Sequence, residues 1–140
     1  MATIENAWYT RLTAHAAVSA VVGTKVYPSV APPETTPPYI TFRVVSAPRI
    51  HHMQGASGFV DARLQTDCWD SRAETANTVA EAVRNAMDTF RGIVAGVTIR
   101  KCLLGDASGE FVIPKAKTER ALHRRRLEFD VGYLEAAPTL

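Results

Sequence analysis

The sequence predicts an α+β fold in which an antiparallel sheet carries helices packed on one face. Two segments, at residues 4–22 and 76–90, repeat apolar residues at the spacing of an amphipathic helix. Several others alternate apolar and polar residues, as strands with one buried face do. The order is helix, two strands, helix, then two or three strands, which is typical of a sheet covered on one side. Because 140 residues suffice for one core, we expect a single domain over residues 1–140.

Composition argues against several classes of protein. The 16 basic and 14 acidic residues leave a net charge of +2, which gives no bulk attraction to nucleic acid. The longest apolar stretch, Ala14 to Val22, is far short of the roughly 20 residues that span a bilayer, so we expect no membrane partner. With 2 cysteines and no basic-then-apolar leader, the chain is expected in a reducing cytosol without a disulfide framework.

The first predicted helix begins after a Thr3 cap and ends at Gly23. Its apolar residues recur at helical spacing: Ile4, Trp8, Leu12, Ala16, Val18, Val21 and Val22. Residues 30–39 then contain four prolines, which remove backbone donors and favour extended backbone. We therefore expect an extended, exposed connector there.

The next segment predicts two strands joined by a long loop. From Tyr39 to Pro48 the apolar residues face one way: Ile40, Phe42 and Val44. From Phe59 to Trp69 one face holds Val60, Ala62, Leu64, Thr66 and Cys68. Between them, Pro48 to Gly58 carries two glycines and small polar residues, which favours a mobile loop with contacts to make.

A second helix and the last strands complete the pattern. Ser71 and Glu74 match a capping box at the helix start, and Gly92 ends the helix. Its buried stripe is Ala76, Val79, Ala80, Val83, Ala86, Met87 and Phe90. The last strands are predicted at Val97–Leu104, Glu110–Ile113 and Ala121–Glu135, and the last has an inner face of Leu127, Phe129, Val131 and Tyr133.

Cys68 is the strongest candidate for chemistry, because it lies between two carboxylates and beside Trp69 in the stretch QTDCWD. A nucleophilic thiolate needs a cation, a histidine or a helix N-terminus beside it. Strand alternation instead turns Cys68 inward, away from Asp67, so we interpret it as a core residue. Without an inward-facing carboxylate pair or a phosphate-binding glycine loop, we expect no catalytic residue and no enzyme, and a thiol enzyme is the third-ranked alternative.

Metal ligation is similarly unsupported by spacing. The candidates are His15, His51, His52, His123 and the two cysteines. Adjacent histidines on an extended segment point to opposite sides, and neither C-x-x-C nor H-x-x-x-H occurs. We expect no metal and no cofactor.

The basic run from His123 to Arg126 leaves two interpretations open. A nucleic-acid-binding module could use Arg124 to Arg126 as a basic patch. On a strand, however, Arg124 and Arg126 share one face with Glu128 and Asp130. We favour this mixed-charge ladder, which suits neighbouring strands or subunits better than a phosphate backbone.

Several segments, taken in order, resemble the tail-completion, or tail-terminator, proteins of long-tailed bacteriophages and gene transfer agents. The segments are PYITF, GASG, VDARLQTDCW, the helix AETANTVAEAVRNAMD and the closing RRRLEFDVGY. The resemblance covers Leu12 to Tyr133 and rests on the series in this order. It implies a tail-terminator-like fold and a structural virion protein without catalytic residues.

The resemblance also implies an assembly. Such a protein forms a hexameric ring on the head-proximal end of the tail tube, stops tube polymerisation and mediates head–tail joining. Its partners would be further copies of itself, the tail tube protein and the head connector or neck protein. It would be assembled in the host cytoplasm and would recognise no nucleic acid directly.

A ring of identical subunits needs exposed sheet edges and loops that reach a neighbour. The proline-rich connector and a loop from Gly105 to Lys117 offer such segments. As the assembly interface we expect Arg49, His51, His52, Met53 and Gln54 in the long loop, together with Arg124, Arg126, Glu128 and Asp130 on the ladder.

Overall fold

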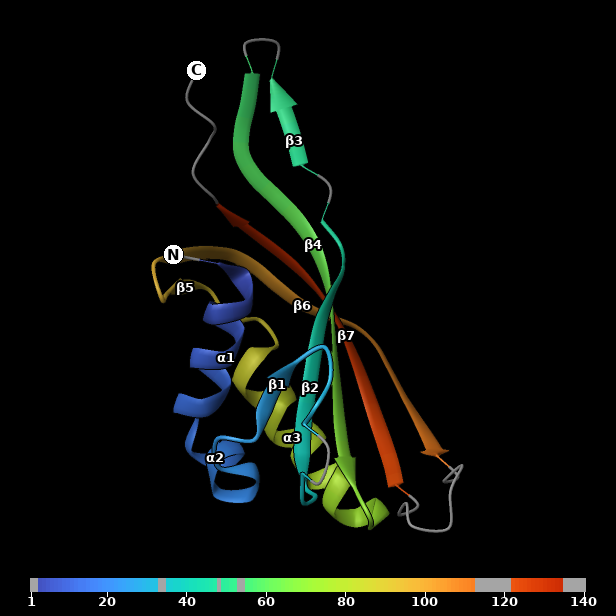
Figure 1. Ribbon diagram of the computed structural model, residues 1–140. Coiled ribbons are helices and arrows are strands. Elements are labelled where there is room, and N and C mark those ends of the chain that lie inside the picture. Colours follow the sequence, from blue (N-terminus) through green and yellow to red (C-terminus); the bar gives the residue numbers. More distant parts are fainter. Residues whose placement is uncertain (1–2, 33–34, 48, 53–54, 113–121, 135–140) are drawn as a thin grey trace.

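The computed structural model describes residues 3–32, 35–47, 49–52, 55–112 and 122–134. These residues form three helices and seven strands (Figure 1). In chain order the elements are α1 (Ile4–Ala14), α2 (Ala16–Val22), β1 (Val26–Pro28), β2 (Tyr39–Ser46), β3 (Arg49–His52), β4 (Gly55–Asp70), α3 (Ala73–Met87), β5 (Gly92–Val94), β6 (Val97–Val112) and β7 (Leu122–Leu134).

The strands form one sheet in the order β1-β2-β4-β7-β6-β5, and β3 also pairs with β4. Every pairing is antiparallel except that of β1 with β2, which is parallel. The expected α+β class is therefore confirmed, but the expected antiparallel sheet is wrong, because this sheet is mixed. The long connector from β1 to β2 brings the chain back in its original direction, whereas a short hairpin turn would have reversed it.

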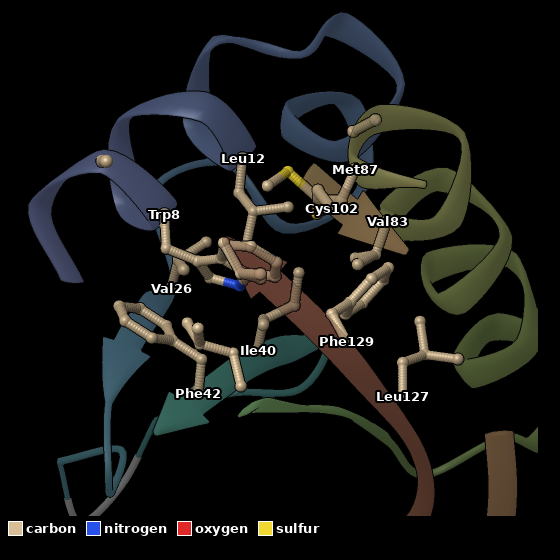
Figure 2. Packing of buried hydrophobic residues seen from close by; sticks show 14 of the residues in the cluster. Trp8, Leu12, Val26, Ile40, Phe42, Val83, Met87, Cys102, Leu127 and Phe129 are labelled. Carbon is tan, nitrogen blue, oxygen red and sulfur yellow. The ribbon is translucent and has the colours of Figure 1, made fainter. Parts of the chain in front are cut away.

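All three helices lie on one side of the sheet, and the core fills the space between them (Figures 1 and 2). Trp8 of α1 packs edge-on against Phe129 of β7, with ring centroids 5.3 Å apart. Its indole N–H donates to the Thr66 hydroxyl at 3.1 Å, so this buried polar group is satisfied. The predicted inner faces of β4 and β7 are confirmed as buried.

The N-terminal helix is two helices rather than one. Its ends are as predicted: the Thr3 hydroxyl accepts the Asn6 N–H at 3.2 Å, and Gly23 adopts a φ of 63°. At His15, however, the backbone is extended, with φ −77° and ψ 121°. The break turns α2 so that both Leu12 and Val18 are completely buried.

The predicted loop from Pro48 to Gly58 is wrong over most of its length. Arg49–His52 forms β3, and β4 starts at Gly55, so the two make a hairpin that stands clear of the rest of the fold (Figure 1). Glycine and serine suggest a loop, but cross-strand pairing decides the conformation here. Met53 and Gln54 lie outside the described residues.

The region that the sequence predicts as two separate strands, Val97–Leu104 and Glu110–Ile113, is also different in the structure. Residues Val97 to Val112 form one strand of 16 residues with an irregularity between Leu104 and Asp106, where Gly105 is the extra residue. The expected loop from Gly105 therefore starts as strand, and its residues 113–117 lie outside the description.

Helix α3 has the predicted buried stripe but not the predicted ends. Ser71 does not cap it, because the N-cap residue is Arg72, whose N–H donates to the Asp70 carboxylate at 3.0 Å. The helix ends at Met87, before Gly92, and Phe90 is only partly buried. The stripe from Ala76 to Met87 is buried as expected.

Candidate assembly surface

The face of the sheet opposite the helices carries the charged ladder. Each residue of this outer face lies beside one on the next strand, so the pairing register determines which charges meet. Arg126 lies opposite Asp67, Glu128 opposite Gln65, and Asp130 opposite Arg63. The predicted ladder of Arg124, Arg126, Glu128 and Asp130 is thus placed on one face.

Asp67 is the centre of a polar network on this face. It is 8% exposed, and its two carboxylate oxygens accept from Arg126 Nε at 3.0 Å and from Gln65 Nε2 at 3.1 Å. Arg43 in turn donates to Gln65 Oε1 at 3.4 Å. The network joins β2, β4 and β7, so Arg126 is held within its own sheet.

Arg124 is held in a similar way. It forms an ion pair with Glu110 of β6, and its guanidinium carbon lies 5.6 Å from the centre of the Trp69 ring. Trp69 stacks on Tyr39 with ring centroids 6.0 Å apart and donates to the Thr41 hydroxyl at 3.0 Å. This end of the outer face therefore holds two stacked aromatic rings and a cation.

The other charges of the ladder are more exposed. Asp130 lies 3.8 Å from Arg63, and their side chains are 49% and 56% exposed. Lys101 and Asp61 form a further pair at 3.2 Å. Glu128 lies between Gln65 and Asp106 on the neighbouring strands. Exposed pairs of this kind contribute little to folding and remain accessible to a partner.

The other predicted interface residues are far from the ladder along the strands. Arg49, His51 and His52 belong to β3, in the projecting hairpin, and Arg49 pairs with Val60 near one end of the sheet. The ladder extends from there toward the other end of β7, where Arg124 pairs with Trp69. The structure therefore separates the expected interface into two surfaces, the hairpin and the outer face.

No arrangement for chemistry accompanies these surfaces among the described residues. Cys68 is completely buried, and burial first, then the Asp67 carboxylate, raises the pKa of its thiol, with Arg125 opposing them. No group of three metal-ligating side chains occurs in the described part of the chain. None of its helices is long and apolar enough to cross a membrane.

The basic run does not form one patch. Arg124 and Arg126 are on the outer face and each pairs with a carboxylate, whereas Arg125 lines a groove beside α3 on the inner side. A nucleic-acid reader would need these cations on one accessible surface. Their division between two faces disfavours that interpretation.

Sequence reasoning missed the Asp67 network. Alternation placed Gln65 and Asp67 on the outer face, but it does not say which strand lies beside β4. The pairing of β4 with β7 supplies Arg126, and that pairing joins residues 59 positions apart. A buried carboxylate opposite an arginine is visible only once the register is known.

The described residues thus form a small α+β protein with a helix-covered inner face, a charged outer face and a projecting hairpin. The chain belongs to a tail completion family: the family model described as Tail completion protein gp17 matches residues 6–133. The predicted resemblance is thereby confirmed. Membership makes the chain a structural component of a virion tail and not an enzyme.

Solved structures share the fold. A chain from the virion of a native gene transfer agent particle is 21% identical, with a TM-score of 0.67 and 92% of each chain covered. A second solved chain is 16% identical, with a TM-score of 0.55 and coverage of 97% of this chain and 96% of that one. No curated protein sequence matches the chain.

Proposed function

We propose that the protein forms a hexameric ring at the head-proximal end of the tail tube, where it ends tube growth and joins the tail to the head's connector. The observation that carries this proposal is the match of the tail completion family over residues 6–133. The likeness to a chain of a gene transfer agent virion supports the fold that such a role requires.

The geometry supports a ring in a second way. A ring of identical subunits needs two different surfaces on each copy, one of which meets the other on the next copy. The projecting hairpin and the charged outer face are two such surfaces at different places on the sheet.

The test is electron microscopy of particles that lack the protein. If the ring ends the tube, tails made without it are overlong or fail to join filled heads, and supplying the intact chain restores both. Tails of normal length joined to filled heads in its absence would contradict the proposal.

A variant tests the part that the hairpin plays. Deleting His51 to Gln54 shortens the hairpin and leaves the core untouched, so the protein should fold yet fail to restore normal tails. The control is Ile93→Ser, which alters a side chain that is 73% exposed on β5. Equal rescue by both variants would show that the hairpin is not part of the assembly surface.

A further inference from the structure

The helices leave part of the inner side of the sheet open beside α3. Ala107 and Gly109 lie on the inner side of β6 and are exposed. A groove of about 360 Å³ lies here, between α3 and the strands β6 and β7, and Arg84 and Arg125 are among its polar lining. Its apolar lining is Ala80, Leu104, Ala107 and Leu127. We call the space bounded by these residues the inner groove.

The two arginines of the inner groove have no counter-charge in the described chain. Arg125 lies opposite the core residue Cys68, and its guanidinium lies over β6 at Gly109, where an added Cβ would come within 2.5 Å of Nη1. Its Nε is buried and has no hydrogen-bond partner among the described residues. Neither Arg125 nor Arg84 forms an ion pair with a described carboxylate. Because an unpaired cation that is partly buried is unfavourable, this groove favours carboxylates supplied from outside.

The outer side of the same two strands has the opposite excess of charge. Asp106 of β6 and Glu128 of β7 lie directly opposite each other, where like charges repel. Neither carboxylate forms an ion pair with a cation of the described chain. Leu103 lies on the same side, opposite Asp130, and is 46% exposed. We call Leu103, Asp106 and Glu128 the outer patch.

The outer patch and the inner groove are complementary. The patch offers two unpaired carboxylates beside an exposed leucine, and the groove offers two unpaired arginines beside an apolar lining. The sheet separates them within one copy, so any contact between them joins two copies. Each copy then keeps one patch and one groove for its two neighbours, as a closed ring requires. Nucleic acid is a poorer occupant, because Glu81 in the groove repels phosphate.

We infer that the outer patch of one copy packs into the inner groove of the next, where Asp106 and Glu128 pair with Arg84 and Arg125. The inference rests on the proposed ring and names surfaces by which its copies meet. It assigns the outer face to the contact between copies, so the projecting hairpin stays available to another tail protein.

A charge exchange tests this contact. In native mass spectrometry with the tail tube protein present, Arg84→Glu and Glu128→Arg should each reduce rings roughly tenfold or more, because like charges then meet. The double variant should restore rings to the wild-type level, because the pair forms again with its charges exchanged. All three variants should keep the wild-type melting temperature, since both side chains lie outside the core.

The matched control is Arg72→Glu. It makes the same change of charge at the exposed N-cap residue of α3, which does not line the inner groove. This variant should form rings as the wild type does.

Carbodiimide cross-linking identifies the occupant. Arg84→Lys keeps the positive charge and supplies an amine that the reagent joins to an adjacent carboxylate. Because the sheet lies between α3 and the outer face, a bond from position 84 to Glu128 must join two copies. Peptide mapping of cross-linked rings should find that bond.

The outcomes separate this inference from the proposed function. Rings that persist in Arg84→Glu and in Glu128→Arg, with no bond from position 84 to Glu128, would overturn the inference and leave the proposed function standing. A bond from position 84 to a carboxylate of another tail protein would overturn the second copy as occupant. A wild-type chain that never forms rings would contradict the proposed function and this inference together.

Discussion

At the scale of single residues, burial separates the side chains that hold the fold from those left for partners. Asp67 is 8% exposed and bound by two donors, whereas the Asp130 side chain is 49% exposed and 3.8 Å from its cation. Both belong to the outer face. A charge on this face therefore has a structural or an accessible role depending on its neighbours, not on its type.

A matched pair of arginines tests that distinction. Arg126→Gln should lower the free energy of unfolding by about 1–3 kcal/mol, because it leaves the buried Asp67 carboxylate without its charged donor. Arg63→Gln should lower it by less than about 0.5 kcal/mol, because the side chains of that pair are about half exposed. Urea denaturation measures both changes. Equal losses of stability would show that the Asp67 network contributes no more to folding than the exposed pair does.

The two thiols give a prediction about pH. Burial raises the pKa of Cys102 from 9.0 to about 12, and it raises the pKa of Cys68 as well. Between pH 9 and 10 the unfolded chain loses these protons and the folded chain keeps them, so stability falls as pH rises. Each thiol contributes a fall of up to about 1.4 kcal/mol per pH unit.

The measurement compares urea unfolding of the wild type with that of the Cys68→Ala, Cys102→Ala double variant at pH 8, 9 and 10. The variant should lose less stability across this range, because other titrating groups are common to both. Parallel losses would show that the thiols ionise in the folded protein. Ellman's reagent gives a second readout: at pH 8 it should react only after unfolding.

At the scale of elements, the faces of strands were predictable and their ends were not. The alternation of Leu127, Phe129 and Val131 is a local pattern, and all three are buried as expected. The ends depend on pairing with distant strands. β3 has only four residues, and the far half of β6 contains glycine and small polar residues; both are strands because β4 and β7 lie beside them.

The start of α3 gives a prediction at this scale. Asp70 is 6% exposed and accepts the Arg72 N–H, so Asp70→Ala should destabilise the protein by about 1 kcal/mol. Ser71→Ala should change stability by less than about 0.5 kcal/mol, because Ser71 is exposed and does not cap the helix. Thermal melts followed by circular dichroism compare them. A larger loss of stability from Ser71→Ala than from Asp70→Ala would show that Ser71 caps the helix, as the sequence predicts.

At the scale of the whole molecule, the class of fold was predictable and the topology only in part. The parallel β1 could not be read from Val26 to Pro28, because three residues carry no information about direction. The sequence also predicts only part of the candidate surface. The ladder followed from alternation, whereas the Asp67 network became visible only once the pairing of β4 with β7 placed Arg126 beside it.

The most direct test of the ring is a reconstruction of purified tails by electron cryomicroscopy, with the protein located by an added tag. The proposal predicts six copies in one ring at the head-proximal end, between the last layer of the tube and the connector. A tag found along the tube, at the opposite end, or in a number other than six would contradict it.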